Sequence, residues 1–298
     1  MSLSDHWPTR DERAFFEREG YLVVPDALSP AQVSGLTEAI ERCRQREESP
    51  PEAFYNRLDI LGQDDAFLEL VDNPAVLGRI SGLLGWNIWV NHTHYNVRPP
   101  DASAEKYRYD WHVDGGMFSQ DLQFQPPMTA IKVGFYLTDL VEPGRGQTFI
   151  YPLSLMEERN WREEFRPFTA PPAEARPLTV KAGSAVLFQQ RTLHSQGSPN
   201  LSAFTRKAIF VQWAFRWLFP VDEMSVGALD ARVQDPVRRQ LLGLDRKRPF
   251  GRLSAKYYPR PEDLPLKNRL IEQVGISRMC ELGPSATRHL TQLLKFEL

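Results

Sequence analysis

Two histidines and one aspartate have the spacing of a metal site. His112 and Asp114 stand two positions apart in the segment 109–116, and His194 follows an apolar stretch much later in the chain. In an extended strand, side chains two positions apart point to the same face, so His112 and Asp114 can bind one ion side by side. Two histidines and a carboxylate make the facial triad that suits Fe(II) and leaves three coordination positions open. The spacing therefore predicts His112, Asp114 and His194 as catalytic metal ligands.

Arg206 is a candidate for binding an organic anion near that metal. It follows His194 and opens the apolar segment Lys207–Phe215, which has the character of a strand. An arginine at the start of a barrel strand can hold a carboxylate through its two-pronged guanidinium. Most single arginines are plain surface residues, so the interpretation depends on the position of Arg206 after His194.

The composition excludes several other classes of protein. The 298 residues carry a net charge of −2, which argues against a nucleic-acid or anionic-membrane binder. Cys43 and Cys280 are too few for a disulfide framework or a cysteine-rich metal cluster. The first residues lack a secretory core, and no apolar run approaches the roughly 20 residues that span a membrane. We expect a cytoplasmic protein without nucleic-acid or membrane partners, and its oligomeric state stays open.

The predicted elements change from helices to strands along the chain. Capping boxes at Thr9 and Ser29, and the pair Asn73-Pro74, each predict the start of a helix. Alternating or apolar segments predict strands at Tyr21–Val24, Trp86–Val97, Ile131–Thr138, Gln147–Tyr151, Leu178–Val180, Ser184–Gln189 and Lys207–Phe215. Further helices are expected within Leu153–Phe165, Asp222–Leu242 and Leu266–Val274. This order predicts an α+β fold with a mainly β core, an antiparallel sandwich or barrel.

Several segments, in the same order, resemble the phytanoyl-CoA dioxygenase family of Fe(II)/2-oxoglutarate-dependent oxygenases. They are Phe16–Ser29 with its Gly20-Tyr21 pair, Val97–Pro100, Trp111–Asp114, Gly183–Phe188 before His194, and Pro199-Asn200 before Arg206. The similarity covers about residues 12–216. The chain departs from the family at Tyr151–Ser154, where a Pro-Gly-Ser-His stretch is common, and this leaves the local loop structure open.

The resemblance implies a double-stranded β-helix, a jelly-roll of the cupin type flanked by helices. His112, Asp114 and His194 would bind Fe(II), and Arg206 would hold the far carboxylate of the cosubstrate 2-oxoglutarate. With O2, the cosubstrate would yield succinate and CO2 while a substrate C–H bond is oxidised, by hydroxylation as the default outcome. Related halogenases lack the carboxylate, so Asp114 argues against halogenation.

We expect one oxygenase domain over residues 1–298. Residues 86–216 would form the β-helix core and residues 1–85 an N-terminal support. Residues 217–298 would form a helical appendage that shapes the substrate pocket.

Residues around these motifs are further candidates for ligand contacts. Polar side chains alternate along the strand that ends at Arg98, and Met117 and Phe118 follow the metal motif directly. The candidates are Arg98, Asn96 and Ser195 for the cosubstrate, with Gln196 and Ser202 as alternatives to Ser195, and Met117, Phe118, His94 and Trp213 for the substrate. For any one aromatic residue, core packing is the more common role. The basic residues Arg238, Arg239, Arg246, Lys247 and Arg248 fit a solvated helix face better than a phosphate site.

Other functions are compatible with the same residues. A cupin-type isomerase or hydrolase could use the triad with zinc or manganese and without 2-oxoglutarate. Within the oxygenase class, cyclisation, desaturation and epimerisation begin with the same hydrogen abstraction as hydroxylation. A silent binding module is disfavoured by the intact triad. The lack of a CoA-binding basic groove favours a specialised metabolite as the substrate.

Overall fold

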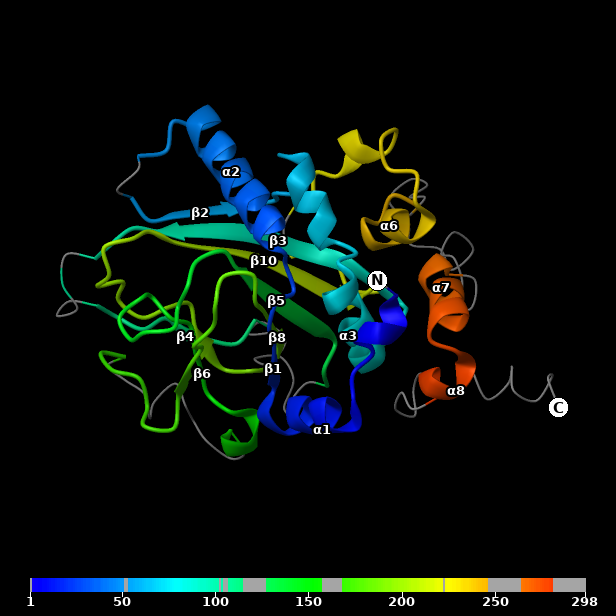
Figure 1. The fold of residues 1–298 in the computed structure, drawn as a ribbon, viewed down its shortest axis with the longest axis horizontal. Helices are drawn as coiled ribbons and strands as arrows, with labels where there is room; N and C mark the ends of the chain where they lie inside the picture. Colours follow the sequence, from blue (N-terminus) through cyan, green and yellow to red (C-terminus); the bar gives the residue numbers. More distant parts are fainter. Residues whose placement is uncertain are drawn as a thin grey trace.

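The chain folds into two antiparallel β-sheets, with helices packed on the larger one (Figure 1). The computed structural model describes residues 2–50, 53–101, 103, 107–114, 127–156, 168–221, 223–245 and 264–280. Its strands are β1 (Tyr21–Val24), β2 (Tyr55–Leu58), β3 (Ile88–Arg98), β4 (Trp111–His112), β5 (Ala130–Tyr136), β6 (Phe149–Ile150), β7 (Arg176–Pro177), β8 (Ala185–Gln189), β9 (His194–Ser195) and β10 (Arg206–Phe215). Its α-helices are α1 (Arg10–Glu19), α2 (Pro30–Arg46), α3 (Pro74–Leu84), α6 (Pro236–Leu241), α7 (Pro265–Gln273) and α8 (Ile276–Met279). Short 3-10 helices are η1 (Leu3–His6), η2 (Asp65–Leu70), η3 (Leu153–Leu155) and η4 (Gly227–Leu229).

The two sheets form a jelly-roll, which confirms the predicted α+β class with a mainly β core. The large sheet has the strand order β1-β8-β5-β10-β3-β2, and the small sheet has the order β4-β9-β6-β7. Neighbouring strands are antiparallel in both sheets. Figure 1 shows α2 and α3 on one side of the large sheet and the strands β4 and β6 on the other.

The predicted helix starts at Thr9, Ser29 and Asn73 are confirmed by their hydrogen bonds. Each of the three side chains caps its helix by accepting the backbone N–H three residues later. Gly20 ends α1 in the left-handed region at φ +83°, and a Cβ there would lie 2.5 Å from Thr192 Oγ1. Only glycine fits this turn, which leads directly into β1.

Alternation along the strands decides what faces the helices and what faces the small sheet. On β5, Ile131 and Val133 belong to the main apolar core shared with the helices. Lys132 and Tyr136 alternate with these residues and point toward the space between the two sheets. Burying each large apolar side chain stabilises the fold by roughly 1.5–3 kcal/mol. The large sheet therefore has an apolar outer face and a partly polar inner face.

Three predicted elements differ from the structure. The strand expected at Leu178–Val180 lies two residues earlier, at β7. Its residues Arg176 and Pro177 are the ones that pair with Ile150 and Phe149 of β6. Only η3 appears in the described part of the expected helix Leu153–Phe165, and residues 157–167 lie outside the described residues. The helical signal at Asp222–Leu242 resolves into the short helices η4 and α6, since Asp235 and the following proline cap a new helix.

The described part of residues 217–298 packs on the helical side of the large sheet. Leu241 and Leu266, from α6 and α7, join the main apolar core. Gln240 Nε2 donates to the Trp86 carbonyl at 2.9 Å and to the Ile88 carbonyl at 3.2 Å, which ties α6 to the start of β3. Within the described ranges, every helix is too short or too polar to span a bilayer.

Candidate active site

Strands β4 and β9 place the two predicted histidines opposite each other. His112 and His194 are register partners, and their ring centroids lie 4.3 Å apart. Asp114 lies in a turn rather than in the predicted strand, because β9 offers only two residues for pairing. Its Oδ1 lies 4.0 Å from His112 Nε2, and one ligand atom from each of the three residues lies within 4.8 Å of the others. The three side chains thus present the donor set of a facial triad.

Each histidine is oriented by a backbone carbonyl. His112 Nδ1 lies 2.9 Å from the Asp110 carbonyl, and His194 Nδ1 lies 2.9 Å from the Thr192 carbonyl. A carbonyl oxygen only accepts, so each Nδ1 carries a proton and each Nε2 keeps its lone pair. Burial, followed by repulsion from His112, lowers the pKa of His194 to about 3. His194 is therefore neutral at pH 7, which is the form that binds metal.

The carboxylate of Asp114 is buried and charged. Its side chain is 10% exposed, and Lys132 Nζ on β5 donates to Oδ1 at 2.6 Å. Burial alone would raise the pKa of Asp114, but the charge of Lys132, helped by His194 and His112, holds it well below its usual range. Oδ2 is buried without a hydrogen-bond partner in the described part of the chain. A charged carboxylate with a bare oxygen, beside two imidazole lone pairs, fits a divalent cation.

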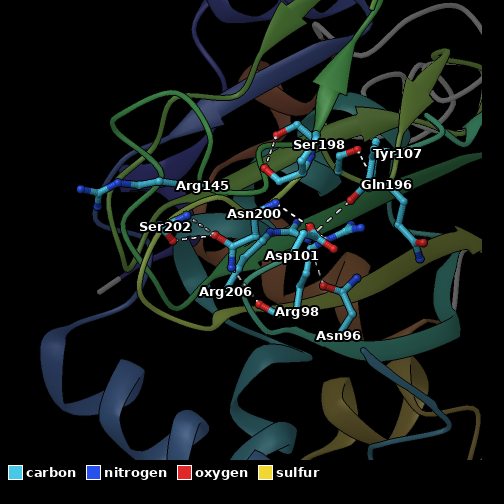
Figure 2. Close-up of polar contacts among 12 residues, drawn as sticks. Asn96, Arg98, Asp101, Tyr107, Arg145, Gln196, Ser198, Asn200, Ser202 and Arg206 are labelled. Atoms are coloured by element: carbon cyan, nitrogen blue, oxygen red, sulfur yellow. Dashed lines mark hydrogen bonds and ion pairs between the residues drawn. The ribbon is translucent and has the colours of Figure 1, made fainter. Parts of the chain in front are cut away.

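Arg206 is fully buried among polar side chains, which include Asn96 and Asn200 (Figure 2). Arg206 Nη1 donates to Asn96 Oδ1 at 3.2 Å and to the Gln196 carbonyl at 3.5 Å. Nη2 donates to Thr148 Oγ1 at 3.2 Å, and the guanidinium lies 5.6 Å from the Tyr136 ring centre. None of these four groups is charged. A buried guanidinium with only neutral partners among the described residues is suited to bind an anion.

Arg98 lies next to Arg206 but has its own counter-ion (Figure 2). Arg98 Nε donates to Asp101 Oδ2 at 3.3 Å, and the same oxygen accepts the Asn200 N–H at 2.7 Å. The Arg98 guanidinium also lies 4.9 Å from the ring centre of Tyr107. Of these two arginines, Arg206 is therefore the one whose charge is available for a bound anion.

A cavity of about 240 Å³ joins the metal-binding group to the partners of Arg206. It lies between the two sheets. Its described lining is Asn56, Leu58, His92, His94, His112, Lys132, Thr148, Phe188, His194, Gln196 and Phe210. None of these residues comes from the described part of 217–298, which was expected to shape the pocket. A small organic molecule can therefore reach both groups from one space.

Two of the three further cosubstrate candidates lie beside Arg206. Asn96 contacts it directly, and Arg98 is its register partner on β3. The third, Ser195, alternates with the cavity-lining His194 and donates to the Gly197 carbonyl at 3.1 Å instead. Of the alternatives in that stretch, Gln196 reaches Arg206, through its backbone oxygen.

The four substrate candidates fall into different places. His94 lines the cavity, stacked at 4.7 Å on Phe210. Trp213 does not: it is fully buried in the main apolar core, because it alternates in phase with Ile209 and Val211 on β10. Met117 and Phe118 lie outside the described residues.

The basic cluster in the C-terminal part is engaged in ion pairs where it is described. Arg238 pairs with Asp72 at 2.7 Å, and Arg239 pairs with Asp230 at 2.7 Å and with Asp245 at 3.0 Å. Arg246, Lys247 and Arg248 lie outside the described residues. The described arginines of this cluster therefore have carboxylate partners within the chain.

Three site residues escaped the sequence interpretation. Lys132 and Tyr136 stood on the polar face of a predicted strand, but the sequence did not show that this face meets the metal group. Thr148 Oγ1 lies 3.2 Å from Tyr136 Oη. Thr148 falls in the predicted strand Gln147–Tyr151, where no sequence pattern marked it as a site residue. The available signal was the lysine inside an otherwise apolar strand.

The fold and the site together define the class of Fe(II)/2-oxoglutarate-dependent dioxygenases. The family model of phytanoyl-CoA dioxygenase matches residues 16–208, so this chain belongs to the phytanoyl-CoA dioxygenase family. As a dioxygenase of this family, it uses iron, 2-oxoglutarate and O2.

Curated relatives and solved structures are similar to the chain over most of its length. The ectoine dioxygenase of Streptomyces avermitilis is 24% identical over 230 residues, which are 66% of this chain and 75% of the relative. The structure of HygX from Streptomyces hygroscopicus, with nickel and 2-oxoglutarate bound, has a TM-score of 0.60 at 15% identity and covers 76% of this chain and 94% of HygX. The carbocyclase SnoK from nogalamycin biosynthesis has a TM-score of 0.57 at 20% identity, covering 78% of this chain and 93% of SnoK. At these identities, the solved structures establish the fold.

Proposed function

We propose that this dioxygenase hydroxylates a C–H bond of a small organic substrate, with His112, Asp114 and His194 as the iron ligands. The observation that carries the proposal is the register pairing of the two histidines, with the bare Asp114 oxygen next to them. Arg206 is the proposed partner of the far carboxylate of 2-oxoglutarate. When bound, iron with 2-oxoglutarate and O2 supplies the oxidant for the C–H bond, and succinate and CO2 are released.

The residues of the chain prepare this chemistry. His112, Asp114 and His194 would hold the ion and would leave coordination positions for the cosubstrate and O2. The carbonyls at Asp110 and Thr192 fix the imidazole orientations. Arg206 would orient the cosubstrate by a charge-assisted hydrogen bond. Asn96 and Thr148 hold the guanidinium in place.

We further propose that the chain is one oxygenase domain and that its substrate is a specialised metabolite. Support for the second point comes from SnoK, a carbocyclase from nogalamycin biosynthesis on the same fold. Hydroxylation is the default reaction of the class, and ring closure or epimerisation would use the same residues.

An anaerobic titration with Fe(II) and 2-oxoglutarate tests the proposed site. The wild-type protein should develop the weak visible charge-transfer band of an iron–keto acid complex. The double variant His112→Ala/Asp114→Ala should lack the band while its circular dichroism stays native. A band that survives in this variant, or that is absent from the wild type, would overturn the assignment.

The variant Arg206→Ala separates the proposal from a zinc- or manganese-dependent isomerase or hydrolase on the same triad. An oxygenase loses 2-oxoglutarate binding in this variant. Metal binding should persist, because Arg206 is not a ligand, and this can be measured by calorimetric titration with Co(II).

A further inference from the structure

Lys132 places a positive charge on the inner wall of the cavity. Its side chain is 8% exposed, and its Nζ donates to Asp114 Oδ1 at 2.6 Å. The register of the large sheet sets Lys132 on β5 beside Gln212 on β10, which in turn pairs with His92 on β3. Lys132 and His92 therefore share one transverse row of inward-facing residues, two strands apart.

His92 and His94 extend this wall along β3 toward Arg206, the proposed cosubstrate partner. His92 Nε2 lies 3.0 Å from His94 Nδ1, and both rings line the cavity. Burial, and next the charge of Lys132, holds the pKa of His94 well below its usual value, so this ring is neutral. A neutral imidazole offers a ligand hydrogen bonds without adding charge. Among the described lining residues of the cavity there is no aspartate or glutamate.

The charge balance of the loaded site, which rests on the proposed function, leaves Lys132 uncompensated. Two positive charges on Fe(II) and one on Arg206 balance two negative charges on 2-oxoglutarate and one on Asp114. Arg98 is already neutralised by Asp101. Once Asp114 shares its charge with a metal, the ammonium of Lys132 remains as one surplus positive charge in a confined space. An unmatched buried charge is costly, so the site favours a ligand that supplies one negative charge.

We propose that Lys132, with His92 and His94, forms a subsite for a carboxylate of the substrate. The substrate class is then a small organic acid or amino acid whose carboxylate lies against this wall while a C–H bond faces the metal. A single ammonium matches a monoanion rather than a phosphate dianion. The imidazole pair can donate a further hydrogen bond to the carboxylate, and Phe188 and Phe210 offer apolar contact to its carbon chain.

Propionate, with propionamide as its neutral isostere, is a suitable probe of the subsite. The anaerobic Fe(II)–2-oxoglutarate complex is titrated with each compound while its visible band is followed. Wild-type protein should show a saturable band shift with propionate and none with propionamide. The shift should persist when 2-oxoglutarate is raised tenfold, because the subsite is separate from the Arg206 site.

Lysine variants assign the response to the subsite. Lys132→Met should raise the apparent Kd for propionate at least about 10-fold, whereas Lys132→Arg should keep it within a few-fold. Lys181→Met, at an exposed lysine, is the matched control and should behave as wild type. The inference fails if wild type does not respond to propionate, if propionamide acts equally, if added 2-oxoglutarate removes the shift, or if Lys132→Met keeps the wild-type Kd.

The design keeps the two hypotheses apart. The band itself reports the iron and 2-oxoglutarate site, and its absence from the wild type would count against the proposed function. A normal band without a propionate response would count only against the subsite. If Lys132→Met does not form the band, the comparison of propionate with propionamide in wild type and Lys132→Arg still decides the inference.

Discussion

Arg98 and Arg206 are register partners on β3 and β10, yet only Arg98 has a carboxylate partner among the described residues. Arg206 is the more deeply buried of the two, and its hydrogen bonds go to Asn96, Thr148 and a backbone carbonyl. Burying an unpaired guanidinium costs several kcal/mol, which a bound dianion would offset. The contrast supports the proposal that Arg206, rather than Arg98, binds the cosubstrate carboxylate.

Replacing Arg206 by glutamine should weaken 2-oxoglutarate binding by about 10- to 100-fold or more. A hydrogen bond to a charged group contributes roughly 1.5–3 kcal/mol, and glutamine keeps the polarity without the charge. The dissociation constant can be read from the anaerobic charge-transfer band. Arg145→Gln is the matched control, because Arg145 pairs with Glu142 away from the cavity lining. Equal affinity in the two variants would contradict the role of Arg206.

Replacing Thr148 by valine should raise the 2-oxoglutarate Kd by roughly 5- to 10-fold. Thr148 Oγ1 lies within hydrogen-bond distance of both Arg206 Nη2 and Tyr136 Oη, and valine leaves these buried groups without that partner. An unsatisfied buried donor costs about 1–3 kcal/mol. Thr148→Ser keeps the hydroxyl and should bind 2-oxoglutarate like wild type. If the serine variant is as weak as the valine variant, the methyl group rather than the hydroxyl matters.

The metal group could be predicted from the sequence because its signals are local. A two-residue spacing and a strand before His194 suffice to nominate His112, Asp114 and His194, and the structure brings all three together. Helix starts were equally accessible, since a capping box lies within four consecutive residues. The prediction that Trp213 contacts the substrate was wrong. Its alternation with Val211 in the sequence already indicated a place in the main apolar core.

The remaining site residues depend on pairing between distant strands, which no local pattern shows. Lys132 meets Asp114 only because β5 faces the small sheet. Thr148, which directly precedes β6 of the small sheet, contacts Arg206 on the large sheet. The polar face of β5 was visible in the sequence, but the register that aims it at the metal group follows from the assembled sheet.

Gly146 should be needed for cosubstrate binding, beyond its effect on stability. Its φ is +73°, and a Cβ there would lie 3.2 Å from Arg206 Cδ. Gly146→Ala should lower the free energy of unfolding by about 1–2 kcal/mol and also displace the guanidinium. Gly144→Ala is a close control, because Gly144 has φ +78° and its Cβ would lie 3.6 Å from Leu201 Cβ instead. Both variants should lose similar stability in urea, and only Gly146→Ala should weaken 2-oxoglutarate binding.

The stability of the metal-free protein should fall on acidification partly through His94. Burial, followed by the charge of Lys132, holds the pKa of His94 well below 6.5, with Asp114 acting in the opposite direction. Below pH 6.5 the unfolded chain therefore binds a proton at this residue that the folded chain does not, so unfolding is favoured as the pH falls. Between pH 7 and pH 5 this single histidine contributes a loss of up to about 2 kcal/mol. Urea unfolding in EDTA should show a smaller acid loss for His94→Gln than for wild type. At pH 7.5 and above the gap between the two proteins should stay constant, because the residue is neutral in both states. An identical pH dependence of the two proteins would show that His94 can be protonated in the folded cavity.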